Sequence, residues 1–224
     1  MAELWATLLP ILLADVLNPV LFAFMVYAAG TQQPLANSSA ILAGHTAAYF
    51  GAGLILLFAA DSITQRLANP QTIDIVIELP IGLALLWAAL RSRSDTGKRP
   101  EDPGPELTPL KSFMLGAVVN FIGIPFALPY FAAIAQITRS DPPLAQALVP
   151  LVAYNLAYAL PFATVPMLRA VMGDDSQVLL ERINAVIDRA AGFLMPLMLF
   201  VVGAALVADA VYYFTTGSVL IDLS

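Results

Sequence analysis

The sequence predicts an all-α integral membrane protein with six transmembrane helices. Of its 224 residues, 59% are hydrophobic and 12% are charged, and the mean hydropathy is +0.81. Soluble domains contain about 25% charged residues, so the composition alone indicates a membrane protein. Six apolar runs are long enough to cross a bilayer. They cover about residues 4–29, 40–60, 73–90, 110–137, 144–172 and 190–214.

The composition also excludes several kinds of site. The chain has no cysteine, which excludes disulfides, thiolate metal ligands and thiol redox chemistry. Its single histidine, His45, cannot build a zinc site made mainly of imidazoles. A net charge of −6 offers no basic surface for nucleic acid, and no phosphate-binding G-x-x-x-x-G-K-[ST] loop is present. We expect no cofactor, no metal and no nucleic-acid partner, and, without a nucleophile–base pair, no enzyme.

The positive charges predict the orientation of the chain in the membrane. With six spans, eight of the ten lysine and arginine residues fall on one side, whereas Arg66 and Arg139 fall on the other. Cytoplasmic loops carry an excess of positive charge. The long polar loop 91–109 is therefore predicted to be cytoplasmic, and both termini are predicted to be extracytoplasmic.

The two halves of the sequence resemble each other. Segment 45–49 (HTAAY) resembles 154–158 (YNLAY), and 63–69 resembles 179–184; residues 13–19 resemble 116–120 with the proline that follows. Three spans per half is an odd number, so the second copy would be inverted, as in many secondary transporters. The alternative is chance similarity between Ala- and Leu-rich helices. We predict a first repeat at 1–90, a flexible loop at 91–109 and a second repeat at 110–224.

The segment Asp15-Val16-Leu17-Asn18-Pro19 is the main candidate site. It lies inside the first apolar run, where a carboxyl, a carboxamide and a proline are all costly. Pro19 cannot donate a backbone hydrogen bond, and clustered polar groups at a helix break form binding sites in many transporters. A carboxyl in hydrocarbon without a cationic partner suits proton binding and release, although Asp15 could also be a protonated structural acid.

Other polar residues of the apolar runs are weaker candidates. Asn120 matches Asn18 in the second half, and both could equally join helices through hydrogen bonds. The same two interpretations apply to Asn155. A lone histidine such as His45 is more often a packing residue than a proton relay, and tyrosines in a bundle are commonly core residues. With these reservations, the predicted substrate site contains Asp15, Asn18, Pro19, His45, Tyr49, Asn120, Pro125, Asn155 and Tyr158.

The length, the six predicted spans, the Asp-x-x-Asn-Pro motif and the charged loop after span three resemble the LysE superfamily of small exporters. Within it, the chain most resembles the actinobacterial Sap/GAP group, the sulfolipid- and glycopeptidolipid-addressing proteins. The resemblance implies a multi-pass plasma-membrane protein, and homodimers are a further implication. The related thiol-transporting CcdA proteins carry a Pro-Cys pair in spans one and four, but Val20 and Phe126 follow the corresponding prolines here. Electron relay is therefore excluded.

These observations predict a secondary exporter that moves a cell-envelope glycolipid or small amphiphile outward. Its site would lie between the two repeats, and Asp15 would couple export to protons. The implied partners are membrane lipids and a small amphiphilic substrate. The alternative is a non-transporting accessory subunit that docks machinery for envelope-lipid synthesis or export.

Overall fold

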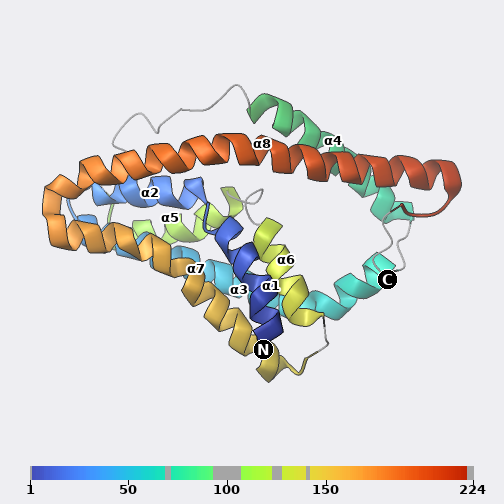
Figure 1. Cartoon of the computed structure of the whole chain (residues 1–224), viewed down its shortest axis with the longest axis horizontal. Helices are drawn as coiled ribbons and strands as arrows, with labels where there is room; N and C mark the ends of the chain where they lie inside the picture. Colours follow the sequence, from blue (N-terminus) through green and yellow to red (C-terminus); the bar gives the residue numbers. More distant parts are fainter. Residues whose placement is uncertain (1, 69–71, 93–106, 123–127, 140–141, 221–224) are drawn as a thin grey trace. The chain divides into compact units, whose positions relative to one another are not determined.

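The computed structural model describes the chain except residues 1, 69–71, 93–106, 123–127, 140–141 and 221–224 (Figure 1). Its described part is helical and contains no strand. The helices are α1 (Ala2–Asp15), α2 (Pro19–Ala29), α3 (Pro34–Ala68), α4 (Thr72–Ser92), α5 (Pro109–Ile122), α6 (Leu128–Thr138), α7 (Leu144–Met172) and α8 (Ser176–Thr216), with a 3₁₀ turn at Gly173–Asp175. The predicted all-α class is confirmed.

The first apolar run is a broken helix. Helix α1 ends at Asp15 and α2 begins at Pro19, and the two are bent by 56°. Asn18 is the N-cap of α2, because its Oδ1 accepts a hydrogen bond from the backbone N–H of Leu21 at 3.1 Å. Pro19 occupies the first turn of α2, where its missing N–H removes no helical bond. The polar motif therefore occupies the break itself.

Within the described residues, four helical segments are long and apolar enough to cross a membrane, and the bent pair α1–α2 makes a fifth if it is one span. These fit a multi-pass membrane protein. The four are Pro34–Ala59, Thr72–Arg91, Leu144–Ala190 and Pro196–Thr216. The remaining predicted span, 110–137, is described as α5 and α6 on either side of residues 123–127. The number six therefore stays a prediction.

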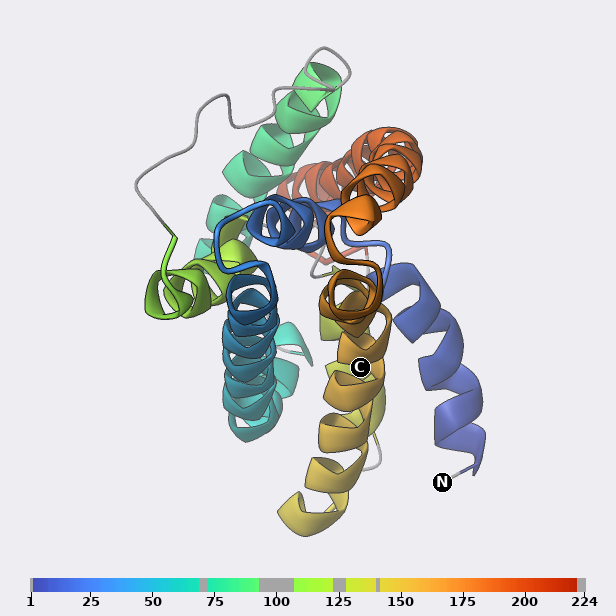
Figure 2. The ribbon, with the colours of Figure 1, turned by 90° about the vertical axis from the view of Figure 1, so that its left-hand side faces the viewer.

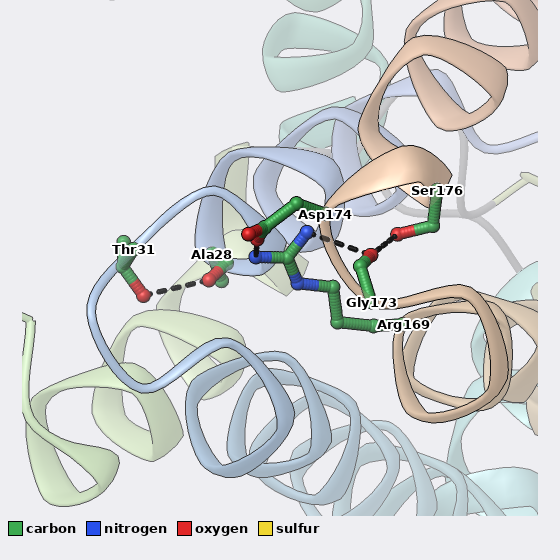
Figure 3. Close-up of polar contacts among 6 residues, drawn as sticks. All are labelled: Ala28, Thr31, Arg169, Gly173, Asp174 and Ser176. Carbon is green, nitrogen blue, oxygen red and sulfur yellow. Dashed lines mark hydrogen bonds and ion pairs between the residues drawn. The ribbon is translucent and has the colours of Figure 1, made fainter.

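Hydrogen bonds and an ion pair stabilise the turn between α7 and α8 (Figure 3). Gly173 has a φ of 57°, which favours glycine, and its carbonyl accepts hydrogen bonds from Arg169 at 2.9 Å and Ser176 at 2.6 Å. Arg169 also forms an ion pair with Asp174. Nearby, the hydroxyl of Thr31 donates to the carbonyl of Ala28 where α2 ends, at 2.7 Å. The backbone N–H groups of Thr31 and Ser176 donate to the same two carbonyls, so side chain and backbone together satisfy these helix ends.

Packing divides the chain into two compact units. The first consists of residues 1–58 and 101–189, and the second consists of 59–100 and 190–224. Each unit therefore takes residues from both predicted repeats. Because these units reflect packing density and not internal repetition, the predicted boundaries at 90 and 110 stay a prediction. The described polar residues of the candidate site all belong to the first unit.

The helices of the first and fourth apolar runs pack in a crossed pattern. Helix α1 packs against α6, and α2 packs against α5. The first described helix of one run thus lies against the second described helix of the other. Two inverted copies of one run would pair in this way, so the pattern favours the inverted repeat, which stays a prediction.

Helices α3 and α5 approach each other at two glycines. A Cβ atom at Gly44 would lie 2.0 Å from the carbonyl oxygen of Phe113, and one at Gly116 would lie 2.1 Å from that of Ile41. Small residues allow such backbone contact in membrane bundles. This contact fixes the part of α3 that carries His45 and Tyr49.

We predict that Gly44→Ala destabilises the protein, because the new methyl group would clash with backbone of α5, which cannot move aside locally. Overpacking of this kind costs about 1–3 kcal/mol. The matched control is Gly51→Ala, since nothing lies within 4 Å of a Cβ atom there. Thermal unfolding in detergent should show a lower midpoint for Gly44→Ala alone; equal midpoints for the two variants would contradict the close α3–α5 contact.

Candidate functional site

Asp15 lies at the centre of a buried polar cluster. Its side chain is 2% exposed and accepts hydrogen bonds from two tyrosine hydroxyls. Tyr49 of α3 lies 2.9 Å from both carboxyl oxygens, and Tyr154 of α7 lies 2.8 Å from Oδ2. Within the described residues, no lysine or arginine forms an ion pair with Asp15. Two tyrosines from different helices thus provide the hydrogen bonds that a buried carboxyl requires.

Asn18 extends the cluster on the other side of the helix break. While its Oδ1 caps α2, its Nδ2 donates to the hydroxyl of Tyr158 in α7 at 3.2 Å. Only Val16 and Leu17 lie between Asp15 and Asn18, and both polar side chains reach α7. The break is therefore held to α7 by two side chains, one on each side.

Tyr130 of α6 links the cluster to Asn155. Its hydroxyl donates to the carbonyl of Tyr49 at 2.9 Å and accepts from Asn155 Nδ2 at 3.1 Å. A Cβ atom built on Gly53 would lie only 2.0 Å from the hydroxyl oxygen of Tyr130. Only glycine at position 53 leaves room for this contact.

Aromatic rings fill the space around these polar groups. The ring of His45 stacks with Tyr49 and Tyr158, with centroids 5.3 and 5.6 Å apart. Tyr49 also stacks with Tyr130 at 3.8 Å, and Tyr158 packs against Phe162. All five rings are at most 5% exposed. The cluster is therefore densely packed on the side of the rings.

His45 and Asn120 are connected through the main chain. Asn120 Nδ2 donates to the carbonyl of His45 at 3.2 Å and to that of Ala117 at 3.3 Å. Among the described residues, neither ring nitrogen of His45 has a hydrogen-bond partner, and neither does Asn120 Oδ1. A buried histidine without partners is uncommon, since such groups usually have at least one.

The structure brings most of the predicted site residues together. Asp15, Asn18, Tyr49 and Tyr158 form one bonded and stacked cluster, His45 stacks on it, and Asn155 joins it through Tyr130. Pro19 starts α2, and Asn120 contacts the backbone at His45. Pro125 lies outside the described residues. Whether these residues bind a substrate stays a prediction.

Two further members were absent from the predicted site. The signal for Tyr154 is its place in segment 154–158, which resembles 45–49, and the signal for Tyr130 is its place directly after Pro129 in an apolar run. Neither signal identifies a partner, because hydrogen bonds across 81 or 139 positions depend on how helices pack. Within the described residues, no group of three or more His, Asp or Glu side chains lies close enough to hold a metal ion.

A groove lies beside the cluster, between α3 and α7. Figure 2 shows the two helices running alongside each other in opposite chain directions. The groove has a volume of about 950 Å³, is open to one side and is almost entirely apolar. Asn155 belongs both to its lining and to the hydrogen-bonded cluster. The groove and the Asp15 cluster therefore share one side chain.

The sequence matches the family described as Sap, sulfolipid-1-addressing protein, over residues 8–212. The chain belongs to this family. The match spans nearly the whole sequence and supports the predicted resemblance to the Sap group. The wider LysE relationship stays a prediction. No curated protein and no solved structure matches the chain.

Proposed function

We propose that this Sap-family protein is a secondary exporter that moves a cell-envelope lipid or related amphiphile across the membrane. The observation that carries the proposal is the position of Asp15, which lies at a helix break and is bonded to tyrosines of α3 and α7. Buried carboxyls in membrane segments commonly form ion or proton pathways. The family's description as lipid-addressing supports a lipid as the cargo.

In this mechanism, Asp15 gains and loses a proton as the bundle changes conformation. The charged carboxyl accepts hydrogen bonds from Tyr49 and Tyr154 and so ties α3 and α7 to the break between α1 and α2. Hydrogen bonds to a charged group contribute about 1.5–3 kcal/mol each. Protonation weakens these bonds, and α3 and α7 are then free to separate from the break. A proton gradient would thereby bias two conformations that expose the site to different sides.

The second candidate is an accessory subunit that directs lipid to a separate machine. The description of the family supports it, because addressing a lipid does not require carrying it. Such a subunit would use an exposed region to dock its partner. The polar loop 91–109, most of which lies outside the described residues, is the natural candidate.

Replacing residues 93–106 with a neutral Gly/Ser linker separates the two candidates. We expect a transporter to keep most of its export in cells, because the linker leaves the Asp15 cluster unchanged. The measurement is the amount of envelope lipid on the outer surface, compared with wild type and with a deletion strain. Loss of export despite normal membrane insertion would favour the accessory subunit.

The transporter is tested by proton movement in proteoliposomes. With a panel of envelope lipids and small amphiphiles on one side, wild type should show substrate-dependent acidification, and Asp15→Asn should lose it because an amide cannot exchange the proton. Glu78→Gln is the matched control, since Glu78 is an acid in α4, outside the cluster. Acidification that survives in Asp15→Asn, or that is absent from wild type across the panel, would contradict the proposal.

A further inference from the structure

We propose that the α3–α7 groove binds the apolar chain of an amphiphile that carries a hydroxyl or amide N–H within its membrane-embedded part, and that this group donates a hydrogen bond to Asn155 Oδ1. The inference names the substrate class for the function proposed above. Binding in the groove does not depend on the proposed function; only the export of the bound amphiphile does.

The groove has the size and the lining that an acyl chain requires. Its volume of about 950 Å³ lies near the upper end of the range for small-molecule sites, about 300–1,000 Å³. Leu42, Ala47 and Phe50 line it from α3, and Val152, Leu156 and Met167 line it from α7. Leu156 and Met167 are 60% and 64% exposed. An open apolar groove of this kind lets a lipid chain enter sideways from the bilayer.

Asn155 is a lining residue of this groove and carries a buried hydrogen-bond acceptor, Oδ1. The side chain is only 3% exposed. Its Nδ2 donates to the carbonyl of Leu151 at 2.9 Å and to the hydroxyl of Tyr130 at 3.1 Å, which uses both amide hydrogens. Because a backbone carbonyl can only accept, these bonds fix which end of the amide is nitrogen. Oδ1 has no partner among the described residues.

The unpartnered acceptor determines which ligands fit best. Leaving a buried acceptor without a hydrogen bond is unfavourable, because the group has lost its bonds to water and gained none in return. A ligand with a hydroxyl or amide N–H at this level removes that cost, whereas a plain ester-linked chain has only acceptors and does not. On the facing helix, Thr46 Oγ1 is a second buried atom of the lining without a partner in the described structure. A hydroxyl there can donate or accept, so it suits the carbonyl of the same amide.

Asn155 also places the ligand within reach of Asp15. Three successive contacts connect them: Asn155 donates to Tyr130, Tyr130 donates to the carbonyl of Tyr49, and the hydroxyl of Tyr49 donates to Asp15. A ligand bound at Oδ1 stabilises the amide orientation on which the first of these contacts depends. Asn155 is therefore a positioning residue between the groove and the carboxyl.

The test uses two photoreactive probes on the full-length protein in lipid nanodiscs. The first is N-palmitoyl methoxyethylamine with a diazirine in the chain, whose only donor is the amide N–H. The second is its N-methyl amide, which has no donor. We expect the first probe to bind wild type about fivefold more tightly, as one net hydrogen bond predicts. Mass spectrometry should place both labels on the groove-lining residues of α3 and α7.

Three variants separate the role of Asn155 from that of the groove. Asn155→Leu should bind both probes equally, and Ala47→Trp should lose both because the indole fills the groove. The matched control is Asn184→Leu, which removes an asparagine with an unpartnered oxygen outside the groove lining and should keep the fivefold preference. If Asn155→Leu fails to fold, the comparison of the two probes on wild type still decides the question.

Equal binding of the two probes to wild type would overturn the proposal. Labelling outside the groove, or cross-linking of groove residues to a second copy of the chain, would also overturn it. Binding of the two probes to Asp15→Asn distinguishes the ligand site from proton-coupled export. A preference that persists there, in a variant without proton movement, supports the ligand site independently of transport.

Discussion

The hydrogen bonding of a buried carboxyl organises the first unit of this protein. Asp15 cannot remain inside an apolar bundle without donors, and Tyr49 and Tyr154 supply them from two helices that are far apart in the sequence. The donors in turn require α3 and α7 to lie against the break between α1 and α2. The broken helix, the stacked aromatic rings and the positions of α3 and α7 are therefore parts of one arrangement.

Helix α1 packs against α6, and α2 packs against α5. These contacts surround the helix break that carries Asp15 and Asn18. The long helices α3 and α7 carry aromatic residues that pack around the break between α1 and α2. The close contact at Gly44 and Gly116 holds α3 in place. The groove lies on the side where α3 and α7 face each other, and Asn155 joins it to the cluster.

The sequence was informative where polar groups interrupt apolar runs. Asp15, Asn18 and Asn155 stand out because each is costly in hydrocarbon, and Pro19 marks the break at which α2 begins. Tyr130 and the groove could not be predicted in the same way. A tyrosine in a bundle resembles any core residue, and an apolar groove has the same composition as an apolar contact. Both depend on how α3, α6 and α7 pack, and a single sequence does not show which helices contact each other.

Proton exchange at Asp15 on binding of an amphiphile can be followed by difference infrared spectroscopy of the carboxyl group, with N-palmitoyl methoxyethylamine added to wild type, Asp15→Asn and Tyr154→Phe in lipid vesicles. We expect a carboxyl band that changes on addition of the amphiphile, is absent from Asp15→Asn, and moves in Tyr154→Phe because one donor is lost. A band that is unaffected by the amphiphile, or that persists in Asp15→Asn, would show that Asp15 does not exchange the proton.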